Sequence, residues 1–92
     1  MEGSYAVAAF RSRGHVLRLN EILTREGIRS LIVSTPREIS AGCGLSVKFG
    51  LEHAGRVKNI VSQMGNANLI GIYLVKTENG VRQRLSPMSI RD

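Results

Sequence analysis

The chain has 92 residues, of which 42% are hydrophobic and 4% aromatic. This length fits one domain over residues 1–92. We expect its core at about residues 5–76, and a turn, a candidate edge strand and a frayed tail over 77–92. A single cysteine excludes an intramolecular disulfide and a structural zinc site, and His15 and His53 do not have metal-ligand spacing. We therefore expect no metal and no cofactor.

The formal net charge is +6, which favours an acidic partner or an anionic ligand. The positive charges are spread along the chain, a distribution more typical of a solvated surface than of nucleic-acid recognition. No apolar run reaches the roughly 18 residues of a membrane span, and no basic leader precedes the first apolar segment. We expect a cytoplasmic protein that does not bind membranes.

Strand-like and helix-like segments alternate along the first half of the chain. Residues 5–10 form a short apolar run that predicts a buried strand. Apolar residues recur at helical spacing over residues 12–26, with Ser12 placed as the N-cap and Gly27 placed to end the helix. Residues 28–34 are apolar and β-branched, which predicts a second strand.

The second half repeats this alternation. Residues 45–49 alternate apolar and polar side chains and predict a third strand with one covered face. An apolar stripe over residues 51–64 predicts a second helix, and residues 69–76 predict a fourth strand. The Asn-Gly pair at residues 79–80 is a strong turn signal, so residues 81–85 are a candidate extra C-terminal strand.

The predicted order β-α-β-β-α-β is that of the ferredoxin-like α+β fold, a four-stranded antiparallel sheet covered by two helices. Right-handed crossovers give the strand order 4-1-3-2. In this topology the loop before the third strand lies at the end of the sheet where the first strand ends and the first helix begins. Cys43 and Gly44 are therefore expected close to residues 10–13.

The only cysteine lies in the segment Thr-Pro-Arg-Glu-Ile-Ser-Ala-Gly-Cys-Gly-Leu, residues 35–45. Gly42 and Gly44 flank Cys43, which removes bulk around the sulfur and allows either a positive φ or a close backbone approach. A cysteine used only for packing more usually lies inside an apolar run. This pattern favours a presented, reactive thiol, and an inert cysteine in a glycine turn is the alternative.

The predicted surroundings of Cys43 are electropositive. A helix N-terminus carries about half a positive charge, and arginines near it add full charges. Such surroundings lower the pKa of a thiol from about 8.5 and favour the reactive thiolate, and they also favour oxyanions. The candidate anion-binding or thiolate-stabilising residues are Arg11, Arg13, Arg37, Ser40, Gly42 and Gly44.

The Pro-Arg-Glu segment at residues 36–38, followed by Gly42-Cys43-Gly44-Leu45, resembles the selenium/sulfur carrier-like family. These are small bacterial domains in which a Pro-Arg-Glu segment precedes a Cys-Gly pair and a strand, and the resemblance extends loosely over residues 5–75. It implies a persulfide or selenopersulfide on Cys43, and a protein that donates or accepts the sulfur or selenium, such as a cysteine desulfurase. The turn at residues 11–15 is more basic than in the family, which leaves the partner's identity open.

Three other functions compete with a carrier. A cysteine enzyme needs a nearby histidine base and an oxyanion hole, and His15 alone could approach Cys43, so a non-enzymatic carrier is favoured. A nucleic-acid-binding module would stack bases on Tyr5, Phe10 and Phe49, which fall short of the aromatic-rich motif of such domains. A regulatory or assembly module could form a homodimer through its exposed sheet face, which the apolar fourth strand at residues 69–76 makes plausible.

Overall fold

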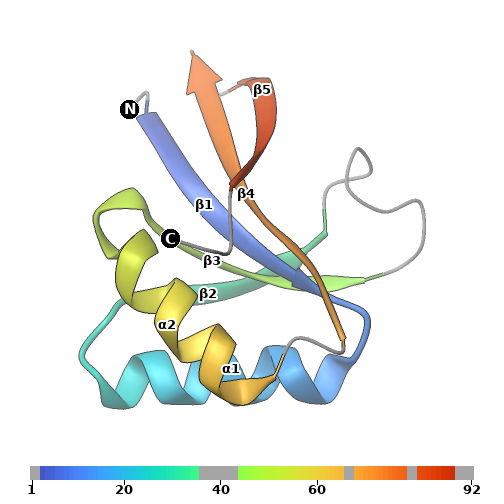
Figure 1. Cartoon of the computed structure of the whole chain (residues 1–92). Coiled ribbons are helices and arrows are strands. Elements are labelled where there is room, and N and C mark those ends of the chain that lie inside the picture. Colours follow the sequence, from blue (N-terminus) through green and yellow to red (C-terminus); the bar gives the residue numbers. More distant parts are fainter. Residues whose placement is uncertain (1–2, 36–43, 66–67, 79–80, 89–92) are drawn as a thin grey trace.

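The chain forms one antiparallel sheet with both helices on the same face (Figure 1). The computed structural model describes residues 3–35, 44–65, 68–78 and 81–88. Its elements, in chain order, are β1 (Gly3–Phe10), α1 (Arg13–Arg25), β2 (Ser30–Ser34), β3 (Leu45–Gly50), the 3-10 turn η1 (Leu51–His53), α2 (Ala54–Met64), β4 (Leu69–Glu78) and β5 (Val81–Met88).

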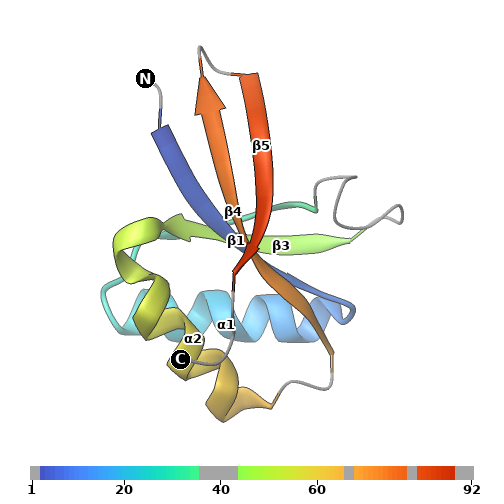
Figure 2. The same cartoon turned by 45° about the horizontal axis from the view of Figure 1, so that its top comes forward.

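The strand order is β2-β3-β1-β4-β5, and every neighbouring pair is antiparallel. The first four strands confirm the ferredoxin-like α+β fold and the order expected from right-handed crossovers. The extra strand is also confirmed: β5 lies along β4 and runs to Met88, three residues beyond the expected end (Figure 2). The predicted turn at residues 79–80 lies outside the described residues.

The first helix begins and ends close to the predicted residues. Ser12 is the N-cap, and its carbonyl oxygen accepts hydrogen bonds from the N–H groups of His15 and Val16, although its side chain makes no capping bond. At the other end, Gly27 adopts a φ of 80°, the left-handed conformation that glycine allows at a helix end. The segment expected to form the second helix divides into η1 and α2.

The core lies between the helices and the sheet. Phe10 and Phe49 are each only 2% exposed there, and Val16 and Leu19 of α1 are fully buried against them. The other buried members of this cluster are Ala6, Ala8, Leu23, Ile28, Val47, Val57, Val61, Leu69 and Ile72. At about 25 cal/mol per Å² of apolar area, this burial is the main force that holds the helices on the sheet.

The opposite face of the sheet is more covered than the sequence predicts. Side chains alternate between faces along a strand, so Ala9, Ser46 and Gly71, which pair across β1, β3 and β4, share the face away from the helices. Ser46 is nevertheless fully buried, so the expectation of one covered face for residues 45–49 is wrong. Tyr73 also lies on this face, and its ring is so close to Gly71 that a Cβ there would be 2.9 Å from it.

Candidate thiol-loop site

The loop that contains Cys43, residues 36–43, connects β2 to β3, and its two ends are held together. The backbone N–H of Thr35 donates a 2.9 Å hydrogen bond to the carbonyl oxygen of Gly44. This pair extends the ladder by one step beyond Ser34 and Leu45. We call residues 36–43 the thiol loop, and Thr35, Gly44 and Ser46 the loop base. Four predicted site residues lie outside the described residues: Arg37, Ser40, Gly42 and Cys43.

The loop base contains a buried pair of hydroxyl groups. The Oγ1 atom of Thr35 and the Oγ atom of Ser46 are 2.7 Å apart, and the two residues are 8% and 0% exposed. Buried hydroxyls are costly unless they are hydrogen-bonded, and each satisfies the other here. No buried side-chain nitrogen or oxygen lacks a partner within the described part of the chain. The pair therefore fixes the end of β2 against the start of β3.

At the loop base Gly44 makes a close approach to Thr35. A Cβ built on Gly44 would be 3.0 Å from Oγ1 and 3.5 Å from Cβ of Thr35. The positive-φ glycines of the described chain are Gly27 and Gly65, so Gly44 does not use the left-handed conformation. Of the two roles that the sequence left open for this glycine, the structure shows the close approach.

The two described arginines of the predicted cluster have different surroundings. The backbone N–H of Arg11 donates to the carbonyl oxygen of Asn68 at 2.7 Å, and its guanidinium donates to that of Leu69 at 3.4 Å. These contacts join the end of β1 to the start of β4, whereas the loop base lies on the β3 side of β1. Arg13 is exposed in the first turn of α1.

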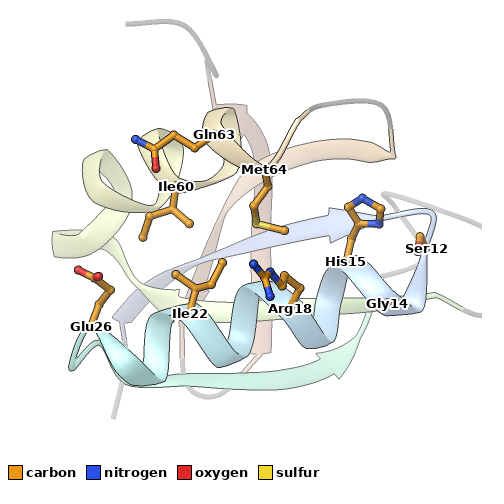
Figure 3. Close-up of a pocket in the computed structure, with 9 residues that line it drawn as sticks. All are labelled: Ser12, Gly14, His15, Arg18, Ile22, Glu26, Ile60, Gln63 and Met64. Carbon is orange, nitrogen blue, oxygen red and sulfur yellow. The ribbon is translucent and has the colours of Figure 1, made fainter.

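His15 lies beside the end of β1, and its ring stacks on that of Phe10 with centroids 5.9 Å apart. It also lines a groove of about 690 Å³ between α1 and α2 (Figure 3). His15 and Arg18 lie toward the N-terminal end of α1, and Ile22 and Ile60 lie in the apolar middle. The other lining residues are Ser12, Gly14, Glu26, Gln63 and Met64.

This groove is not among the sites predicted above, although the sequence holds a signal for it. Residues 15, 18 and 22 follow helical spacing and so share one side of α1, next to the core stripe. At the far end of the groove, Glu26 forms an ion pair with Arg56. Within the described residues Arg18 has no carboxylate partner. The groove therefore has a positively charged end and an apolar middle, which suits an acidic segment that also carries apolar groups.

A metal site and a membrane-spanning helix are both absent from the described part of the chain. No group of three or more His, Cys, Asp or Glu side chains there could hold a metal ion. Neither described helix is long and apolar enough to cross a membrane.

The strand order, the two helices on one face and the cysteine loop between β2 and β3 define a ferredoxin-like domain with a candidate thiol site. The model of the family described as "Putative Se/S carrier protein-like" matches residues 5–73. The match covers well over half of the chain and includes the loop base and the whole thiol loop, and the chain belongs to this family. No curated protein and no solved structure matches it.

Proposed function

We propose that the protein carries sulfur or selenium as a persulfide or selenopersulfide on Cys43, between a donor and an acceptor protein. The observation that carries this proposal is the family match over residues 5–73, which includes Cys43. The protein then acts as a thiol carrier and has no catalytic cycle of its own. The reducing cytosol, where lone thiols remain free, is the compartment that this chemistry needs.

The transfer requires no net oxidation or reduction. The Cys43 thiolate attacks the terminal sulfur of a donor persulfide, a new S–S bond forms, and the donor's S–S bond breaks. The donor cysteine leaves as a thiolate with the bonding electron pair, as in thiol–disulfide exchange. In delivery Cys43 is the donor. An acceptor thiolate attacks the outer sulfur on Cys43, and Cys43 leaves as the thiolate. A selenium atom in the outer position follows the same course.

The described residues support the proposal through the loop base. Gly44, the covalent neighbour of Cys43, is hydrogen-bonded to Thr35, and Thr35 is hydrogen-bonded to Ser46. A held loop base reduces the conformational freedom that a partner would otherwise have to remove on docking. A carrier must present its thiol to two successive partners, so a loop with fixed ends suits the task.

The charge of the chain supports a protein partner with an acidic surface. The net charge is +6, and α1 carries Arg13 and Arg18, both exposed, in its first two turns. Complementary charge speeds the encounter of two proteins more than it tightens their complex. We propose a cysteine desulfurase or a similar persulfide-bearing protein as the donor.

A nucleic-acid-binding module is the less favoured alternative. Base stacking on the sheet needs exposed aromatic rings, but Phe10 and Phe49 are buried under the helices. Tyr5 lies on the other face, where the ammonium group of Lys48 lies 4.3 Å from its ring centroid. A nucleic-acid role would give strongly salt-dependent binding that Cys43→Ser does not change.

The proposal is tested by intact mass spectrometry after incubation with a cysteine desulfurase and cysteine, and then with selenocysteine. We expect a mass gain of one sulfur or one selenium atom that a reductant reverses. The matched control, Cys43→Ser, should gain nothing. An unmodified wild-type chain, in a reaction where the desulfurase turns over, would contradict the carrier function.

A further inference from the structure

The β2 strand forms one edge of the sheet, and its sequence lacks the charges and the proline that protect many edge strands. Leu31 is 58% exposed and Ile32 is 37% exposed, and the strand Ser30–Ser34 contains no charge and no proline. Unprotected edges of this kind pair readily with another strand. The sequence of the opposite edge strand, β5, contains two arginines and a proline. The fourth strand, which the sequence offered as part of a dimerising sheet face, has β1 and β5 on its two sides and so has no free edge for strand pairing.

The hydrogen bonds of β2 determine which backbone groups face the free edge. The Thr35–Gly44 bond joins directly opposed residues, and in an antiparallel ladder such bonded pairs alternate with non-bonded ones. Leu31 and Val33 therefore direct their N–H and C=O groups toward β3. Ser30, Ile32 and Ser34 direct theirs toward the open edge. The middle of these three is Ile32.

We propose that β2 pairs antiparallel with β2 of a second copy of this chain, about a two-fold axis at Ile32. The strand reads Ser-Leu-Ile-Val-Ser, which is almost the same in both directions. The axis brings Ile32 opposite Ile32, Leu31 opposite Val33, and Ser30 opposite Ser34 of the other copy. These serine and isoleucine pairs are the residues whose backbone groups face the edge. Self-complementarity of this kind is what a two-fold interface requires.

A side chain on α1 extends the apolar surface on the Ile32 side of the strand. Asn20 accepts a 2.7 Å hydrogen bond from the Ser30 hydroxyl, so this side of α1 faces the β2 edge. Leu17, 52% exposed, lies one turn before Asn20 on that side. The helix and the strand run in opposite directions. Counted from the Asn20–Ser30 contact, Leu17 lies about 4.5 Å back along the helix and Ile32 lies about 6.6 Å forward along the strand. Both residues therefore lie toward the same end. Leu17 and Ile32 thus lie near each other on the helix side of this edge, and Leu31 is exposed on the opposite face of the same strand.

The pairing also adds a residue to the thiol-loop site, a consequence that rests on the proposed carrier function. Continuing the register by one step sets Thr35 opposite Arg29 of the second copy. Arg29 is exposed in the single chain. In the dimer its guanidinium lies beside the loop base, on the face where the Thr35 and Ser46 hydroxyls meet. A second copy thereby supplies an additional positive charge beside the loop base.

The dimer is tested by sedimentation equilibrium in reductant, with Cys43→Ser as the parent so that thiol chemistry plays no part. An interface formed by two short strands is small. We therefore expect the average mass to rise from that of one chain to that of two as the protein concentration increases from about 10 μM to 1 mM. Ile32→Lys, which places two positive charges together at the axis, should remain monomeric throughout. Gln63→Lys adds the same charge at an exposed site on α2 and should dimerise like the parent.

Three further variants keep the test decisive if Ile32→Lys folds poorly. Ile32→Pro removes an N–H that faces the edge and not β3, which an edge strand tolerates, and it should also abolish dimerisation. Under mild thiol oxidation, Ile32→Cys should cross-link across the axis. Ser34→Cys should not, because its two copies lie about 13 Å apart in this register.

A parent that stays monomeric to about 1 mM would overturn the proposal. So would a dimer that survives both Ile32→Lys and Ile32→Pro, or cross-linking through Ser34→Cys alone. A monomer that instead binds a different protein through β2 would assign this edge to that protein and overturn the dimer. None of these results would bear on persulfide transfer, since each is obtained without Cys43.

Discussion

The hydroxyl groups of Thr35 and Ser46 lie 2.7 Å apart in the interior of the protein, at the point where the thiol loop leaves the sheet. Thr35 ends the ladder of β2 and Ser46 belongs to β3, so this contact joins the two strands by side chains where their backbone ladder stops. When one member of a buried hydrogen-bonded pair is removed, the other is left without a partner and stability falls. Replacing both members by apolar groups is nearly neutral. This asymmetry makes the pair testable.

Removing one hydroxyl of the pair should destabilise the protein. Ser46→Ala leaves the Thr35 hydroxyl buried without its partner, and Thr35→Val does the same to Ser46. We expect each variant to lower the free energy of unfolding by about 1–2 kcal/mol, measured by urea denaturation. The double variant should cost clearly less than the sum of the two. Strict additivity would show that the hydroxyls do not interact.

A methyl group at position 44 should disturb the loop base. In Gly44→Ala the new Cβ approaches the Thr35 hydroxyl to about the limit of normal contacts, 3.0 Å, so we expect a loss of about 1 kcal/mol and an altered rate of Cys43 alkylation. Thr35→Ala removes the clashing oxygen and should relieve most of the extra cost. Gly55→Ala is the matched control: nothing lies within 4 Å of its Cβ on α2, and it should stabilise the protein by about 0.5–1 kcal/mol.

Much of the fold could be predicted from local sequence signals. The Ser12 cap position, the helix-ending Gly27 and the periodic apolar residues between them define α1 almost to the residue. The alternation of strands and helices, with right-handed crossovers, then gives the order of the first four strands. The Asn-Gly pair at residues 79–80 similarly indicates the hairpin partner of β4, although β5 continues three residues beyond its predicted end.

The details of the site could not be predicted in this way, because they depend on pairing between distant residues. The burial of Ser46 follows from its register opposite Ala9 and from the cover over the second face of the sheet, which no local pattern shows. The contact of Arg11 with Leu69 spans 58 positions in the chain. The sequence does predict Gly44 as a special position, but only the structure shows that the Thr35 hydroxyl is the reason.

The two described arginines of the predicted cluster should differ in their effect on the thiol. We expect Arg13→Gln to raise the pKa of Cys43 by a few tenths of a unit to about one unit, since it removes a positive charge that the sequence predicts to lie near the thiolate. Arg11→Gln should raise this pKa less, because the guanidinium of Arg11 is directed to the Leu69 carbonyl on β4, and it should instead lower stability. The pH dependence of iodoacetamide alkylation measures both values. A larger pKa change for Arg11→Gln would contradict this assignment.

The positive end of the groove between α1 and α2 should contribute to the docking of an acidic partner. Arg18 lines this groove, is exposed and has no carboxylate partner within the described residues, whereas Arg25 of the same helix pairs with Glu21 at 3.6 Å. We expect Arg18→Gln to slow persulfide transfer from the donor several-fold at low salt, mainly through the association rate. Arg25→Gln, with the same loss of charge, should have a smaller effect. Because exposed charges are screened beyond about 8 Å at physiological ionic strength, the difference should shrink as salt is added. Equal rates for the two variants at low salt would show that docking does not use this groove.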